Sequence, residues 1–246
     1  MIWEGHTTSD PRAPGVRRRR AGPGDAGGAG PLYRIGALSL PIAFAMLRWA
    51  AYVGIAAIVL AVPPAFIGYA RGHRPRVLVA ALGLLAGAAA FGIPFQWQQS
   101  ARSVPPIHDI TTDLENPPVF QAVVPLRADA QNSLERPANL AQQQRDGYPD
   151  LAPVTLPMPL DQAFDRALAE AQDAGWRIVT ADKASGRLEA TDTTRWFGFE
   201  DDVIVRLTPW GSGTRVDVRS VSRIGRSDVG TNARRIRRYL AELEAN

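Results

Sequence analysis

Two long apolar stretches dominate the hydrophobic pattern of the N-terminal part of the chain. Residues 49–70 and 77–97 contain no charged side chain. At about 1.5 Å per residue, a helix of either length crosses the roughly 30 Å hydrocarbon core of a bilayer. The second stretch is rich in Ala and Gly, which let transmembrane helices approach closely. The pattern therefore predicts two transmembrane helices within residues 49–97, arranged as a hairpin.

The segments on either side of this hairpin have a different composition. Residues 1–34 are rich in Gly, Pro and Arg without periodicity, which predicts a disordered tail. Residues 35–48 include an apolar piece too short to span a bilayer, so we expect them at its interface. Residues 98–157 are rich in Pro, Gln, Asn and Asp, which predicts an extended linker whose first part packs along the following domain.

Residues 158–246 alternate between helical and strand periodicity. An amphipathic pattern runs from Leu160 to a stop signal at Gly175, and a second one closes the chain after Asp228. Between them, alternating apolar positions predict four strands, the last two joined by a turn at residues 211–213. This order predicts the α+β class. We expect a two-layer antiparallel sheet with two helices on one face, preceded by the transmembrane helical hairpin.

Charge is divided unevenly along the chain and indicates an orientation. Residues 1–102 carry 11 basic residues against three acidic ones, whereas residues 103–246 carry 17 against 21. Three arginines lie in the short connection at residues 71–76, which favours a cytoplasmic loop. The prediction is a bacterial inner-membrane protein with residues 103–246 in the periplasm. The same topology places the Arg17–Arg20 run outside, which the positive-inside rule disfavours.

The first candidate for chemistry is the set His108, Asp109 and Asp113. A histidine and carboxylates this close could hold a metal or transfer protons. The chain has no cysteine and His108 is the one histidine in the domain, so a catalytic zinc lacks its usual donors. Asp109 and Asp113 are equally suited to turns and caps. We predict no cofactor, and nucleophile-elbow and Walker-type motifs are absent.

Two further groups are candidates for ligand or partner binding. Trp196, Phe197 and Phe199 surround a glycine, and they either form an exposed patch that docks a partner or the membrane, or fill the core at a strand bend. Arg223, Arg226 and Asp228 precede the last helix. They either bind an anion at its N-terminus or form a solvated, paired surface. On one shared face, the two groups would suit a molecule with an apolar part and an anionic head.

Three strings carry a family resemblance: PPIHDITTD at 105–113, WFGFEDD at 196–202 and SRIGRSDVGTNARRIRRYL at 222–240. Over roughly residues 104–244 the sequence resembles the domain-of-unknown-function 1499 family, and in particular the bacterial membrane-anchored members of that family. The resemblance implies an envelope protein of unassigned biochemistry. The predicted function is that of a non-enzymatic binding module. Its predicted partners are the membrane lipid bilayer and, in addition, an envelope protein, a lipid or an anionic ligand. Nucleic acid is not a predicted partner. The alternative is a metal-dependent or acid/base hydrolase using His108, Asp109 and Asp113.

Overall fold

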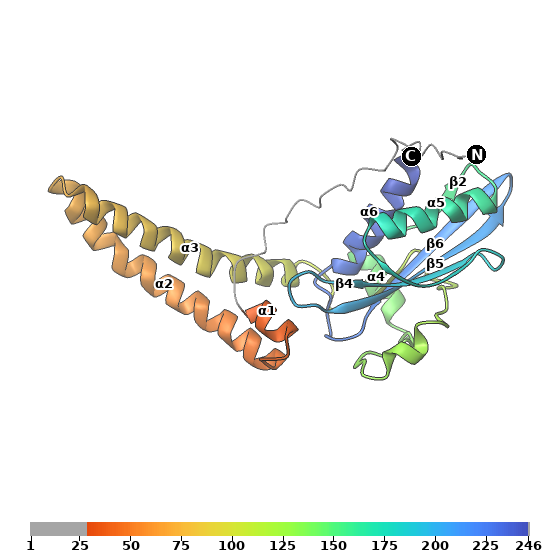
Figure 1. Cartoon of the computed structure of the whole chain (residues 1–246), viewed down its shortest axis with the longest axis horizontal. Helices are drawn as coiled ribbons and strands as arrows, with labels where there is room; N and C mark the ends of the chain where they lie inside the picture. The colour runs from red at the N-terminus through yellow and green to blue at the C-terminus, as the bar shows by residue number, and fades with distance from the viewer. Residues whose placement is uncertain (1–28, 246) are drawn as a thin grey trace, which may run out of the picture.

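Two long helices project away from the rest of the chain in the computed structural model, which describes residues 29–245 (Figure 1). They are α2 (Leu40–Ala70) and α3 (Arg74–Arg102), preceded by the short helix α1 (Ala29–Arg34). Both long helices are long and apolar enough to cross a membrane. Helix α2 begins at Leu40 rather than at the predicted Trp49, and α1 occupies the end of the predicted disordered tail. The rest of that tail lies outside the described residues.

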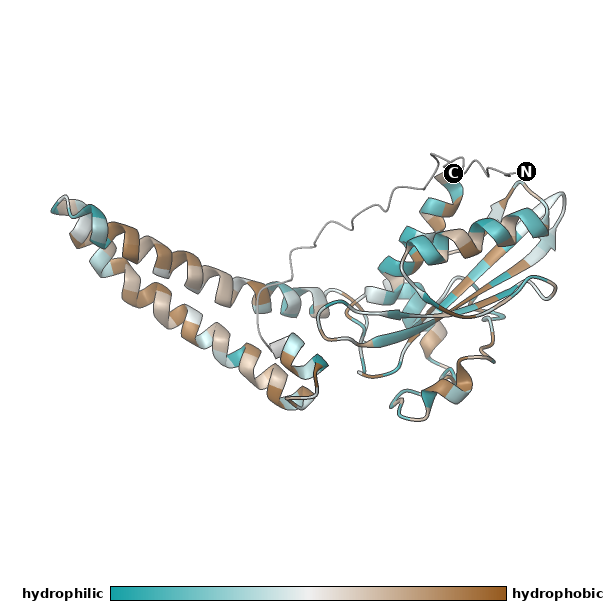
Figure 2. Ribbon diagram, viewed as in Figure 1, coloured by the Kyte–Doolittle hydropathy of each residue, from teal (hydrophilic) through white to brown (hydrophobic). Residues whose placement is uncertain are grey.

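The two helices pack closely through small residues. A Cβ added to Gly54 would lie 2.8 Å from the carbonyl oxygen of Gly87, and one added to Gly87 would lie 2.7 Å from that of Gly54. Neither position tolerates a side chain without separating the helices. Large apolar side chains such as Leu60 and Phe66 point outward, each more than 70% exposed, and Figure 2 shows apolar residues along most of the hairpin. Such a surface is unfavourable in water and suits a lipid environment.

The remainder of the chain is built on a six-stranded antiparallel sheet of order β1–β6–β5–β4–β3, with β2 also paired to β6. Its strands are β1 (Asp109–Thr111), β2 (Val154–Leu156), β3 (Arg177–Asp182), β4 (Arg187–Thr193), β5 (Glu200–Trp210) and β6 (Gly213–Ser222). The predicted strands correspond to β3–β6. Strands β1 and β2 come from the predicted linker, and both pair with β6 through buried residues, Ile110 and Leu156. Residues 98–157 therefore contribute to the sheet itself.

One face of the sheet is covered by α5 (Leu160–Asp173) and α6 (Thr231–Ala245), which confirms the predicted α+β class (Figure 1). The main core lies between them and includes Phe164, Val205 and Ile236. Trp176 stacks on Tyr239 with ring centroids 4.7 Å apart, and the Tyr239 hydroxyl donates to the Ala167 carbonyl at 2.8 Å. The aromatic pair thus joins both helices to the start of β3.

The opposite face of the sheet is covered by the first part of residues 98–157, which the sequence predicted to pack along the domain without indicating the face. Residues 113–137, including the 3-10 turn η1 (Val124–Arg127), lie on this side of the sheet and form the covering segment. Helix α4 (Leu140–Gly147) follows, and its Gln144 side chain bonds the backbone N–H and carbonyl of Thr111 in β1. Phe120 and Val123 pack on Ile204 in a small apolar cluster. The buried carboxylate of Glu189 accepts the backbone amides of Gln121 at 2.9 Å and Val123 at 3.0 Å. Charged side chains on this face thus hold the covering segment in place.

Candidate functional site

Asp109 of the first candidate set is part of a buried ion pair. Its carboxylate, 2% exposed, accepts two bonds from the Arg219 guanidinium at 3.0 and 2.8 Å. Arg136 donates a third hydrogen bond to this carboxylate. Burial lowers the pKa of Arg136, and the negative charge of Asp109 acts in the opposite direction. Both oxygens of Asp109 are therefore occupied by two guanidinium groups, and the carboxylate connects β1 to β6 and to the covering segment.

Asp113 lies in a separate network. One of its oxygens accepts the backbone amides of Glu115 at 3.1 Å and Asn116 at 2.9 Å, as expected for an Asp that initiates a turn. The other accepts from Arg206 and Arg215, both at 3.0 Å. These two arginines also bind Asp217. Asp113 thus fixes the turn after β1 to strands β5 and β6.

His108 shares no partner with either carboxylate. Its Nδ1 atom lies 3.5 Å from the carbonyl oxygen of Arg226, and its own carbonyl accepts the side-chain amide of Asn232 at 2.9 Å. Among residues 29–245, no three His, Asp or Glu side chains are grouped so that they could hold a metal ion. The structure therefore distributes His108, Asp109 and Asp113 over three sets of contacts and does not bring them together in one cavity.

Arg223 of the second binding group is also paired. Its guanidinium donates to both oxygens of Asp202 at 3.0 and 2.9 Å and forms an ion pair with Glu200. These interactions, that with Asp202 first, raise the pKa of Arg223. Asp202 is fully buried and also binds Arg127. Arg226, by contrast, is exposed, and no ion pair within residues 29–245 includes it.

Asp228 caps helix α6. Its carboxylate oxygens accept the backbone amides of Gly230 at 2.8 Å and Asn232 at 2.6 Å. The first free amides of the helix are therefore satisfied by the chain itself. An anion at this helix end would have to displace Asp228, so the structure does not bring Arg223, Arg226 and Asp228 together as an open anion site.

At pH 7, Asp228→Asn should unfold at the same urea concentration as the wild type or at a higher one. Asp228→Ala should have a free energy of unfolding about 0.5–2 kcal/mol below that of the wild type. Asparagine keeps the cap without burying a charge. Burial raises the pKa of Asp228, so the folded state takes up its proton more readily than the unfolded state. The advantage of Asn over Asp should therefore shrink as the pH falls from 7 through the raised pKa. Equal losses for both variants would contradict this role.

The aromatic group lies in the loop between β4 and β5 and packs on the helices of the same chain. Phe197 is 3% exposed, stacks on Phe199 at 5.0 Å, and lies 5.7 Å from Phe44 and 6.3 Å from Trp97, between ring centroids. Tyr33 of α1 completes this group. We call these five residues the junction cluster. It attaches the sheet domain to α1, α2 and α3 in addition to the chain connection after Arg102.

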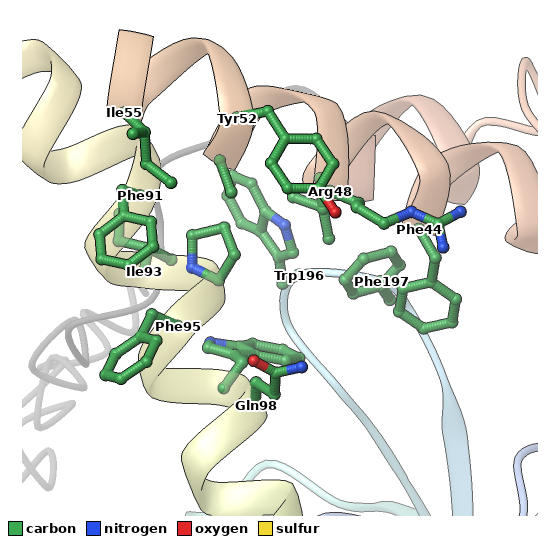
Figure 3. A pocket seen from close by; sticks show the side chains of 14 residues that line it. Phe44, Arg48, Tyr52, Ile55, Phe91, Ile93, Phe95, Gln98, Trp196 and Phe197 are labelled. Atoms are coloured by element: carbon green, nitrogen blue, oxygen red, sulfur yellow. The ribbon is translucent and has the colours of Figure 1, made fainter. Parts of the chain in front are cut away.

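A cavity of about 440 Å³ lies next to the junction cluster, between α2, α3 and the β4–β5 loop (Figure 3). The helices touch at Gly54 and Gly87 and diverge toward the sheet domain (Figure 1). Trp196 and Phe197 close the resulting space from the domain side. The lining is mainly aromatic and aliphatic: Phe44, Leu47, Ala51, Tyr52, Ile55, Phe91, Ile93, Pro94, Phe95 and Trp97, with Arg48 and Gln98 as polar members.

The charged residues of the helices around this cavity are all basic. Residues 26–108 contain no Asp or Glu. Arg48 is the one charged residue of the lining, and neither it nor Arg34 belongs to an ion pair within the described residues. Arg34 instead donates to the carbonyl of Arg195 at 3.1 Å. The arrangement can hold an apolar group inside and an anion at its edge.

A family model described as "Protein of unknown function (DUF1499)" matches residues 109–243. The chain belongs to this family. A search of curated proteins finds no match. The DUF1499 region begins at β1 and ends within α6, so it includes the whole sheet, the buried ion pairs and the β4–β5 loop. The part of the cavity contributed by α2 and α3 precedes it.

The candidate residues Trp196 and Phe197 lie on the DUF1499 side of this cavity, and the other side is formed by α2 and α3. The sequence offers Trp196 and Phe197 either as an exposed docking patch or as core aromatics, and it does not single out Phe44, Arg48 or Phe91. The available signal was the cluster of aromatic residues at the domain end of both apolar stretches, namely Trp49 and Tyr52 in α2 and Phe91, Phe95 and Trp97 in α3.

Proposed function

We propose that this DUF1499 protein is a membrane-anchored, non-enzymatic binding module of the bacterial cell envelope. The observation that carries the proposal is the junction cluster, which packs the sheet domain directly on the base of the α2–α3 hairpin. A domain attached in this way stays at the bilayer surface instead of moving on a flexible linker. Its ligand or partner is then a component of the membrane or of the adjacent space.

The proposed location is the inner membrane, with the sheet domain in the periplasm. Arg71, Arg74 and Arg76 lie at the tip of the hairpin, at the end opposite the domain (Figure 1). Arginines in a short loop favour the cytoplasmic side. Because each helix crosses the membrane once, a cytoplasmic tip puts residues 103–246 on the outer side.

Binding is favoured over catalysis by the arginine partners of three carboxylates in the sheet domain. Asp109, Asp113 and Asp202 each accept bonds from two arginines. A carboxylate whose oxygens already accept bonds from two guanidinium groups is not placed to take a proton from a substrate, because a general base must lie within hydrogen-bond reach of that proton. The alternative hydrolase would need His108, Asp109 and Asp113 to act together, and their contacts lie in three different places.

Alkaline phosphatase fused after Asn246 should be active in bacterial cells, because this enzyme matures only in the oxidising periplasm. A cytoplasmic fluorescent reporter fused at the same position should be dark. Replacing Arg71, Arg74 and Arg76 together by Gln should reduce the active fraction, since these charges orient the hairpin. The proposed location is wrong if the phosphatase fusion is stably expressed and inactive while the fluorescent fusion is bright.

A further inference from the structure

We propose that the cavity at the base of the hairpin holds one acyl chain of an anionic phospholipid from the surrounding bilayer, with its phosphate on Arg48. This inference rests on the proposed membrane location and goes further, because it names the ligand of the junction. It uses the cavity, the residues that line it and the charge distribution of the helices.

The position and lining of the cavity match an acyl chain. Its volume of about 440 Å³ lies within the range of about 300–1,000 Å³ that is usual for small-molecule sites. Tyr52 and Phe95 line it and are 56% and 46% exposed, so the lining continues onto the outer surface of the hairpin. A chain from the neighbouring lipid can therefore enter sideways without crossing water.

The small number of polar groups in the lining argues against a peptide or glycan. Arg48 and Gln98 are its main hydrogen-bonding side chains, together with the polar tips of Tyr52 and the tryptophans. A peptide segment or a sugar would leave several polar groups without partners in this space, at a cost of roughly 1–3 kcal/mol each. A hydrocarbon chain has no such groups. The shape and chemistry of the cavity thus favour lipid.

The charge around the cavity selects an anionic headgroup. Arg48 lies between Tyr52 and Phe44 at the edge of the cavity (Figure 3). With no acidic residue in positions 26–108, no carboxylate of the helices competes for its guanidinium. Arginine binds phosphate oxygens well, and an arginine near an anionic bilayer contributes about 1 kcal/mol. Phosphatidylglycerol should therefore be retained in preference to phosphatidylethanolamine.

The test uses the full chain in nanodiscs of phosphatidylethanolamine with or without phosphatidylglycerol, followed by native mass spectrometry. The wild type should retain one phosphatidylglycerol. Ala51→Phe fills the cavity and should abolish retention, whereas Ala50→Phe, on the neighbouring position outside the lining, should not. Arg48→Gln should reduce the preference for phosphatidylglycerol about fivefold. Arg102→Gln, at the end of α3 and outside the lining, should leave it unchanged.

Equal lipid retention in wild type and Ala51→Phe would overturn the inference, as would retention of phosphatidylethanolamine without preference. Retention of a peptide or glycan in place of lipid would also overturn it. If Ala51→Phe fails to fold, quenching of Trp196 in the wild type decides the question. The fluorescence of Trp196 is the part of the signal that is lost in Trp196→Phe. Brominated phosphatidylglycerol should quench this part more strongly than brominated phosphatidylethanolamine does. Unselective quenching would contradict the inference.

The outcome is separable from that of the proposed function. An active phosphatase fusion combined with no retained lipid would reject the lipid site and leave the envelope module standing. An inactive fusion would reject the periplasmic location, whereas lipid retention in nanodiscs is measured without reference to either side of the membrane.

Discussion

Asp202→Ala should lower the free energy of unfolding of the sheet domain by about 3–5 kcal/mol. Asp202 has no exposed surface and accepts bonds from Arg127, Arg223 and Thr191. Removing the carboxylate leaves the buried guanidinium of Arg127 without its counter-ion and leaves Arg223 with Glu200 alone. The unfolding temperature of a domain of this size should fall by roughly 10–20 °C. Urea unfolding of the full chain in detergent, followed by near-ultraviolet circular dichroism, measures the change.

Glu115→Ala is the matched control. It also removes one carboxylate from an arginine pair, but Glu115 and its partner Arg145 are largely exposed, with side chains at 84% and 48%. An exposed pair contributes only about 0–1 kcal/mol, so this variant should unfold close to the wild type. If Asp202→Ala and Glu115→Ala shift the transition equally, the buried network does not hold the covering segment on the sheet.

Gly54→Leu should separate α2 from α3 at the point of their closest contact. A Cβ at this position would lie 2.8 Å from the carbonyl oxygen of Gly87, and backbone cannot move aside as a flexible side chain can. Overpacking of this kind costs about 1–3 kcal/mol. The equilibrium ratio of packed to separated helices should therefore fall by roughly 5- to 150-fold. Gly92→Leu is the control, because an added Cβ there meets nothing within 4 Å.

A disulfide can report this separation, since the natural chain has no cysteine. A Cβ on Gly83 would lie 3.5 Å from the Cβ of Ala61, within the range for a disulfide. The double variant Ala61→Cys and Gly83→Cys should therefore cross-link on mild oxidation. Adding Gly54→Leu should slow cross-linking strongly, and adding Gly92→Leu should not. Unchanged cross-linking with Gly54→Leu would show that the helices do not depend on this contact.

The helices and long strands of the sheet domain were predictable because their residues follow one period over many positions. Leu160, Phe164 and Ala171 mark α5 at helical spacing, and alternating residues mark β5 and β6. Strands β1 and β2 span three residues each, which is too short for a period to stand out. Their strand character comes from pairing with β6, so it is a property of the folded domain and not of the local sequence.

The burial of charged side chains on the face opposite α5 and α6 could not be predicted for a different reason. Arg206 and Asp217 alternate with apolar neighbours in the way that solvent-facing residues do, and a strand with one charged face normally leaves that face in water. Here the partner of Arg219 is Asp109, 110 positions away. Burial of such a face is favourable only once distant residues neutralise each charge. No local pattern carries that information.

The cavity depends on tertiary structure in the same way. Each contributing segment was visible in the sequence as an aromatic group or an apolar stretch, but their convergence follows from the divergence of α2 and α3 and from the position of the β4–β5 loop. Trp196 and Phe197 are candidates from the sequence because they lie beside Gly198 and shortly before three acidic residues. Arg48 carries no such local signal.

Labelling single cysteines at the two ends of the molecule tests most directly whether the hairpin anchors an outward-facing domain. In bacterial cells with a permeabilised outer membrane, a membrane-impermeant maleimide should label Ser212→Cys, which lies exposed in the turn between β5 and β6. It should label His73→Cys, at the exposed tip of the hairpin, only after the inner membrane is disrupted. Labelling of both cysteines in intact inner membranes, or of His73→Cys alone, would contradict the account.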